Sequence, residues 1–127
     1  MKKALIVEDN PDNLRLMTYI LQREDYEILS AEDGEQGVQI AADTKLDLII
    51  MDIMLPGIDG MESTRRIRAS EPEGNKGNPP IIAMTSYAMR GDREKILAAG
   101  CNGYIEKPVD PLRVMTEIKK IIQKEKI

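Results

Sequence analysis

Acidic residues follow two of the most apolar segments of the chain. Glu8 and Asp9 come directly after residues 4–7, and Asp52 comes directly after residues 48–51. Carboxylates that lie together repel one another and raise each other's pKa unless a cation lies among them. Oxygen ligands without Cys or His favour a hard cation, and a partly hydrated Mg²⁺ suits a site with few protein oxygens. If these carboxylates meet in the folded chain, they predict a magnesium site.

A hydroxyl and a lysine stand at corresponding positions farther along the chain. Thr85 ends one apolar segment, and Lys107 directly follows another. A metal and a lysine can neutralise an incoming phosphoryl group while a carboxylate oxygen attacks phosphorus in line. Carboxylates are established nucleophiles in such covalent chemistry. Asp52 is therefore the candidate nucleophile, and Lys107 is the candidate counter-charge.

Five short segments rich in β-branched residues alternate with five amphipathic segments. This alternation predicts an α/β fold, a doubly wound, five-stranded parallel sheet with five helices on its two faces. Ligands of such sheets lie at the carboxyl ends of the strands. The acids, the threonine and the lysine are therefore predicted to meet at one edge. The predicted strands are residues 4–7, 26–31, 46–51, 81–84 and 103–106.

Capping signatures mark most of the predicted helix starts. The first helix is predicted to run to about Arg23 and the fourth to cover residues 92–99, whereas residues 70–80 are predicted to form the longest loop. The capping pairs are Asn10 with Pro11, Asp33 with Gln36, Asp59 with Glu62, and Asp110 with Pro111. The predicted inward-facing side chains are Val38, Ala41, Ala42, Met61 and Ile67, and, in the last helix, Leu112, Met115, Ile118 and Ile122.

Composition narrows the class of protein. The 127 residues suit one domain, residues 1–127, with no output domain. No apolar run approaches the ~20 residues of a membrane span, and a net charge of −4 argues against nucleic-acid binding. A single cysteine predicts a cytoplasmic location. Histidine is absent, so any phosphohistidine donor would belong to a partner protein.

Four segments together resemble the receiver domain of two-component response regulators, and the resemblance covers essentially the whole chain. It implies a flavodoxin-like receiver fold with strand order 2-1-3-4-5 and Asp52 as the phospho-acceptor. It also implies that Glu8 and Asp9 hold Mg²⁺, with Mn²⁺ tolerated, and that the Met54 backbone carbonyl is a further ligand. Lys107 would pair with the phosphoryl oxygens. The matching segments are residues 7–10 (VEDN), 51–60 (MDIMLPGIDG), 84–86 (MTS) and 107–108 (KP).

The same resemblance implies a switch and its partners. Thr85 would move toward the phosphoryl group, and Tyr104 would turn inward with it. Phosphorylation by a histidine kinase or a histidine phosphotransfer protein would then change the face around residues 87–92, from Tyr87 to Asp92, and the last helix. A downstream protein target would read that face. In similar receivers, the residues two positions after the acceptor and two after the switch threonine help set how readily water attacks the phosphoryl group. Here these residues are Met54 and Tyr87, which are bulky and carry no carboxylate or amide to orient water, so the resemblance implies slow self-dephosphorylation.

Several alternatives stay open or are disfavoured by particular residues. A single-domain regulator is favoured, and a receiver excised from a hybrid histidine kinase or larger regulator is the alternative. An aspartate-nucleophile phosphatase would need an acid two residues after Asp52, where Met54 stands. We therefore expect no turnover on an external substrate. A flavodoxin-like electron carrier is disfavoured because Glu8, Asp9 and Asp12 would repel a flavin phosphate.

Overall fold

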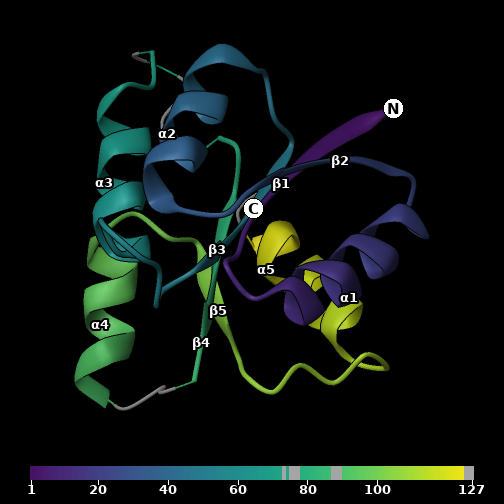
Figure 1. Cartoon of the computed structure of the whole chain (residues 1–127). Helices are drawn as coiled ribbons and strands as arrows, with labels where there is room; N and C mark the ends of the chain where they lie inside the picture. The colour runs from purple at the N-terminus through teal and green to yellow at the C-terminus, as the bar shows by residue number, and fades with distance from the viewer. Residues whose placement is uncertain (73, 75–77, 87–89, 125–127) are drawn as a thin grey trace.

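All five strands run parallel in one sheet, in the order β2-β1-β3-β4-β5 (Figure 1). The computed structural model describes residues 1–72, 74, 78–86 and 90–124. The sequence-based prediction of the fold class and strand order is confirmed. The strands are β1 (Lys2–Val7), β2 (Tyr26–Ala31), β3 (Leu48–Asp52), β4 (Ile81–Thr85) and β5 (Gly103–Glu106).

Helices cover both faces of the sheet, α1 and α5 on one side and α2, α3 and α4 on the other (Figure 1). Alternate strand residues point to opposite faces, so the central strands are apolar on both sides and read as continuous hydrophobic runs. In β1, Ala4 and Ile6 pack toward α1 and α5, whereas Leu5 and Val7 pack toward the other three helices. The helices are α1 (Pro11–Gln22), α2 (Gly34–Asp43), α3 (Gly60–Ala69), α4 (Arg90–Ala98) and α5 (Val114–Lys124).

The predicted caps of the first three helices are confirmed. The side chain of Asn10 accepts hydrogen bonds from the backbone N–H groups of Asp12 and Asn13 at 2.9 and 3.1 Å. Asp33 and Asp59 cap α2 and α3 in the same way. These caps satisfy backbone donors that the first turn of a helix leaves without a partner. They start each helix directly after the strand end or loop that carries the acidic residues.

The last helix departs from the prediction. It begins at Val114 rather than at Asp110–Pro111, and residues 111–113 form turns. The Asp110 side chain accepts a hydrogen bond from the backbone N–H of Leu112 at 2.9 Å, and its carbonyl accepts one from Val114. Asp110 thus caps a turn that precedes the helix, which leaves Leu112 outside the core at 92% exposure. Val114 takes the buried place that was predicted for Leu112.

Smaller differences concern element bounds and one inward-facing residue. Ala42 is exposed at the outer side of α2, so its predicted inward position is wrong, although Val38 and Ala41 do pack against the core. Strand β3 begins two residues later than predicted, at Leu48, and α4 begins earlier, at Arg90. Among the described residues, no helix is long and apolar enough to cross a membrane.

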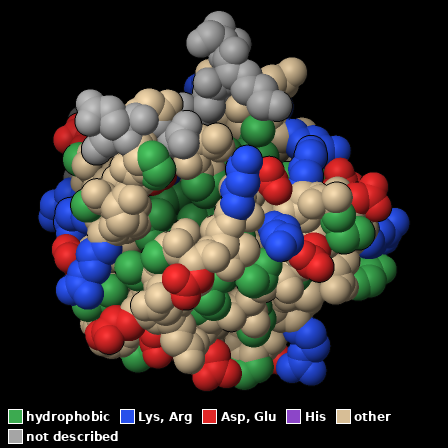
Figure 2. All heavy atoms as spheres, turned by 90° about the horizontal axis from the view of Figure 1, so that it is seen from above, with side chains coloured by type: hydrophobic (Ala, Val, Ile, Leu, Met, Phe, Trp, Pro, Cys, Tyr) green, Lys and Arg blue, Asp and Glu red, His purple; other side chains and the backbone are tan. Residues whose placement is uncertain are grey.

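A hollow of about 600 Å³ lies at the amino-terminal edge of the sheet. Figure 2 shows this face from above, with a hydrophobic floor and charges of both signs scattered around it. The lining comes from the end of α2 and the segment that follows it, the end of α3, and both ends of the loop before β4, and includes Leu46, Ile67 and Pro79. The acidic residues singled out by the sequence lie at the opposite edge, so this hollow is not the predicted magnesium site.

Candidate functional site

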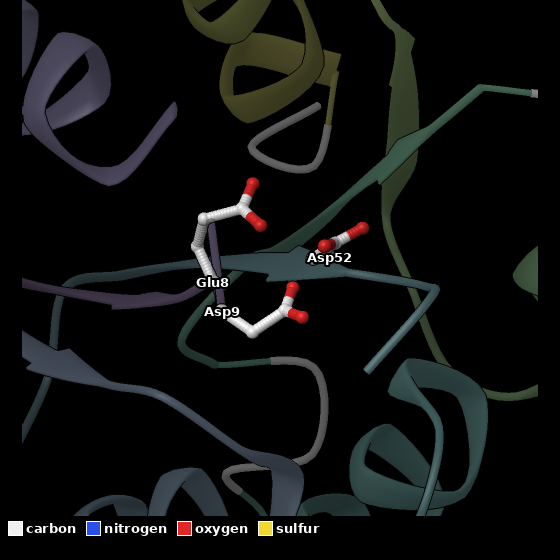
Figure 3. Close-up of side chains that lie close together, drawn as sticks. All are labelled: Glu8, Asp9 and Asp52. Carbon is white, nitrogen blue, oxygen red and sulfur yellow. The ribbon is translucent and has the colours of Figure 1, made fainter. Parts of the chain in front are cut away.

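Three carboxylates meet at the carboxyl edge of the sheet, as predicted. Glu8 and Asp9 follow β1, and Asp52 ends β3. Their carboxylate oxygens lie within 4.8 Å of one another. Figure 3 shows the three side chains arranged around a common space. Glu8 and Asp52 are each only 4% exposed, whereas Asp9 is exposed. The cluster is therefore open to solvent on the side of Asp9.

Backbone hydrogen bonds fix two of these acids. The N–H of Glu8 donates to the carbonyl of Ala31 at 3.0 Å, which continues the pairing of β1 with β2 by one residue. The N–H of Met54 donates to Asp52 Oδ1 at 3.2 Å. Glu8 and Asp52 are thus both positioned by the ends of buried strands, which are among the most rigid parts of such a fold.

A glycine allows α3 to begin directly over the Asp52 backbone. A Cβ at Gly60 would overlap the backbone oxygen of Asp52, and the Gly60 N–H donates to the carbonyl of Ile53 at 2.9 Å. Only a residue without a side chain fits this approach. Sequence reasoning included Gly60 in a matching segment but assigned it no role. Its place directly after the capping Asp59 was the available signal.

Lys107 joins the ends of three strands. Its Nζ donates to Glu8 Oε1 at 3.1 Å and lies 3.2 Å from Asp52 Oδ1. Its backbone N–H donates to the carbonyl of Thr85 at 2.8 Å, and the peptide bond to Pro108 is cis. The lysine side chain is 17% exposed. The predicted proximity of this lysine to the acids is thus observed.

The cluster holds more acidic groups than basic ones, with three carboxylates beside one lysine. The pKa of Glu8 is raised from 4.5 to about 7, chiefly because burial disfavours its charge. The hydrogen bond and the negative charge of Asp52 act in the same direction, whereas Lys107 and the backbone N–H of Asn10 partly oppose them. Burial alone would lower the pKa of Lys107, but its hydrogen bond to Glu8 and the charge of Asp52 raise it overall. The lysine is therefore firmly protonated, and it does not balance three carboxylates.

This donor set fits a hard divalent cation. It consists of carboxylate oxygens, with neither Cys nor His in the cluster, which is the ligand chemistry of Mg²⁺ and Mn²⁺. An exposed acid beside two buried ones leaves a path for a partly hydrated ion. A cation in the common space would favour the charged form of Glu8, and so oppose both its burial and the repulsion from Asp52.

The structure also describes three other residues that were named from the sequence. Thr85 is buried at the end of β4, at 5% exposure, and Met54 is 75% exposed beside Asp52. Tyr104 lies outside the cluster, half-buried on β5, with the guanidinium of Arg93 5.3 Å from its ring centre. Nothing in the sequence pointed to Arg93. Tyr87 lies outside the described residues.

A family model describing the response regulator receiver domain matches residues 4–119. The chain belongs to this family. Receiver domains act as phospho-acceptors in two-component signalling rather than as turnover enzymes, and the acidic pocket of this chain is typical of their phosphorylation site.

Relatives of this receiver differ greatly in size. It is 36% identical to the polar-differentiation response regulator DivK of Brucella ovis, over 95% of this chain and 96% of DivK. It is 34% identical to the sensor protein GacS of Pseudomonas syringae pv. syringae, over 93% of this chain but only 13% of GacS. The receiver thus matches nearly all of one relative and a small part of the other.

Two solved structures are informative. The receiver domain of the sensor histidine kinase PA1611 from Pseudomonas aeruginosa PAO1 superposes with a TM-score of 0.82 at 38% identity, over 96% of this chain and 98% of that one. That structure holds a magnesium ion in its active site cleft. A second structure contains the receiver domain of the response regulator Ssk1 together with the histidine phosphotransfer protein Ypd1 of Saccharomyces cerevisiae. The comparison gives a TM-score of 0.85 at 29% identity, over 99% of this chain and 92% of the matched chain. Receiver domains pair with histidine kinases or such phosphotransfer proteins.

Proposed function

We propose that Asp52 accepts a phosphoryl group from the phosphohistidine of a partner histidine kinase or phosphotransfer protein. One observation carries the proposal: three carboxylates have oxygens within 4.8 Å of one another, and two of them, Glu8 and Asp52, pair with the half-buried Lys107. Asp52 is the member of that cluster that ends the central strand β3. The phosphorus–nitrogen bond of the donor would break as the bond to Asp52 forms, and the imidazole would leave with a proton.

Each side chain has a defined part in this reaction. Asp52 Oδ1 accepts a hydrogen bond from the Met54 N–H and lies beside Lys107 Nζ. Oδ2 would therefore be the attacking oxygen. Glu8, Asp9 and Asp52, with the Met54 carbonyl, would hold Mg²⁺, which when bound would supply positive charge for the phosphoryl oxygens. Lys107 would exchange a carboxylate partner for a phosphoryl oxygen.

Phosphorylation would bias a two-state element. Thr85 lies at the end of β4, next in the sheet to the strand that carries Asp52. Its hydroxyl would move toward the phosphoryl group, Tyr104 would turn inward, and the face around residues 87–92 and α5 would change. That face would contact a downstream protein target, with residues 1–127 acting as one receiver domain.

The test is phosphorylation by a small phosphodonor. We expect incubation with acetyl phosphate and Mg²⁺ to add the mass of one phosphoryl group, and EDTA to prevent it. Asp52→Asn should lose the modification. Asp33→Asn is the matched control, because Asn caps a helix as well as Asp does and Asp33 caps α2 outside the cluster. A modification that survives in Asp52→Asn would contradict the proposal.

Phosphoryl lifetime is a separate consequence. The Met54 side chain is 75% exposed and has no group to orient water, so we propose slow self-dephosphorylation, with Tyr87 acting alongside it. Replacing Met54 and Tyr87 with Asn should shorten the half-life of the phosphorylated form, measured by mass spectrometry after removal of the donor. Rapid decay in the wild-type protein that these replacements leave unchanged would argue against this role.

A further inference from the structure

Arg93 and Tyr104 connect α4 to β5 through a cation–π contact. The guanidinium carbon of Arg93 lies 5.3 Å from the centre of the Tyr104 ring, within the range of this interaction. Arg93 is exposed, whereas the ring is half-buried and packs against the core beneath α4. No described carboxylate forms an ion pair with Arg93, and residues 87–91 contain no acid. Among the described residues, the Tyr104 ring is therefore the contact that positions this guanidinium.

The register of the sheet places Tyr104 on the same face as Thr85. Tyr104 pairs with Ala83, and Glu106 pairs with Thr85. Paired residues of parallel strands, and residues two apart in one strand, share a face. Ala83 packs in the core on the side of α4, so the hydroxyl of Thr85 lies on that side too. A row of side chains thus runs from the surface at Arg93 through Tyr104 to the strand end beside the acidic cluster.

We propose that Arg93 is a positioning residue that holds the Tyr104 ring at the surface of the α4–β5 contact and opposes its inward movement. The inference rests on the proposed function, in which Tyr104 turns inward when Asp52 is phosphorylated. A guanidinium stays hydrated only at the surface, because moving its charge into the core is costly. The ring loses this contact when it turns inward. The contact therefore favours the half-buried ring, by roughly two- to fivefold in an equilibrium constant for an exposed pair.

Removing the guanidinium should ease the inward movement. We expect Arg93→Ala to bind beryllofluoride, a phosphoryl analogue, in the presence of Mg²⁺ roughly two- to fivefold more tightly than the wild type. Without the cation–π contact, less of the binding free energy is needed to turn the Tyr104 ring inward. Loss of a positive charge alone has the opposite sign, since it weakens the binding of an anion. The direction of the change therefore separates ring release from simple electrostatics.

Two variants control for other causes. Arg23 lies 5.7 Å from the centre of the Tyr19 ring, and both residues are exposed and four positions apart at the end of α1. Arg23→Ala removes the same charge and the same kind of contact, but that contact lies within one helix rather than between α4 and β5. The beryllofluoride affinity of this variant should therefore equal that of the wild type. In a Tyr104→Ala background, Arg93→Ala should have no further effect.

Calorimetric titration with Mg²⁺ and beryllofluoride measures the affinities, and ¹³C-labelled tyrosine reports the ring by NMR. Tighter binding by Arg93→Ala, with the Tyr104 ring signal shifted toward its beryllofluoride-bound position, supports the inference. Unchanged or weaker binding overturns it and leaves the proposed function standing, as does an equal change in the Tyr104→Ala background. A wild-type protein that binds no beryllofluoride with Mg²⁺ would overturn the proposed function as well.

Discussion

The two ends of the parallel sheet hold their buried charges in opposite ways. At the amino edge, the Arg68 guanidinium pairs with Glu71 and donates to three other acceptors. These are the Gly100 carbonyl at 2.9 Å, the Pro79 carbonyl at 2.8 Å and the Asn102 side-chain oxygen at 2.7 Å. The cation is 13% exposed and has acceptors on several sides. This end has the character of a structural clasp that ties the end of α3 to the turns before β4 and β5.

At the carboxyl edge, the charges do not balance. The carboxylates of Glu8, Asp9 and Asp52 lie together, and Lys107 pairs with Glu8 and Asp52. The pKa of Glu8 is raised to about 7, chiefly by burial and further by Asp52. A buried charge with all its partners in place stabilises one structure, whereas unrelieved repulsion favours whatever ligand relieves it. The comparison therefore assigns stability to the Arg68 end and ligand binding to the Asp52 end.

The largest expected effect is on stability at the amino edge. Arg68→Ala should lower the free energy of unfolding by about 3 kcal/mol, because it removes the largely buried ion pair with Glu71 and three further hydrogen bonds. Urea denaturation measures this loss. Mg²⁺ affinity should be unchanged. If Arg68→Ala were as stable as the wild type, or bound Mg²⁺ more weakly, the assignment of stability to the Arg68 end and of ligand binding to the Asp52 end would be wrong.

The next effect is the pH dependence of metal binding at the carboxyl edge. Below its pKa of about 7, Glu8 must lose a proton before its carboxylate can take part in binding Mg²⁺. We expect the affinity to rise about tenfold per pH unit from pH ~5 to ~7 and to level off above that. Titration calorimetry at several pH values measures the slope. A flat profile would show that Glu8 does not limit binding.

A smaller effect is expected from Glu8→Gln at neutral pH. The substitution keeps the shape and removes one carboxylate, so Mg²⁺ affinity should fall about tenfold and lose its pH dependence. In the metal-free protein, the raised pKa acts on stability. Between pH 4.5 and about 7 the folded chain keeps a proton on Glu8 that the unfolded chain has lost. This contribution is therefore present below pH 4.5 and lost as the pH rises to 7.

The difference in unfolding free energy between Glu8→Gln and the wild type isolates that contribution. It should grow in favour of the variant as the pH rises from 5 to 7, because only the wild type has a carboxyl that must ionise in a buried site. Equal slopes for the two proteins in urea denaturation would contradict the raised pKa.

The smallest effect is expected at a surface arginine near the clasp. Arg66 donates to Glu62 at 3.0 Å, but both side chains are largely exposed, and Glu62 keeps Arg65 as a second partner. Arg66→Ala should leave the urea midpoint close to that of the wild type, because solvent screens such pairs. A loss as large as that of Arg68→Ala would mean that burial is not what distinguishes the clasp.

Much of the fold followed from local signals. The bounds of β2 and β5 were predicted correctly, because each is a short apolar segment between polar turns. Asn10, Asp33 and Asp59 cap their helices as predicted, because a cap depends on backbone groups only a few residues away. The start of α5 was wrong for a related reason. Asp110 followed by Pro111 has the same local signature whether it opens a helix or a preceding turn, and the turn left Leu112 exposed.

The sequence by itself determined which chemistry was available: three acids, a hydroxyl and a lysine at strand ends, in a parallel sheet whose carboxyl edge brings strand ends together. Only the tertiary structure decided which of these side chains contact one another. It placed Lys107 between Glu8 and Asp52, required a glycine at position 60, and set Arg93 against Tyr104. It also built the Arg68 clasp from residues up to 34 positions apart. Such pairings depend on register and helix packing, and no local pattern of residues encodes them.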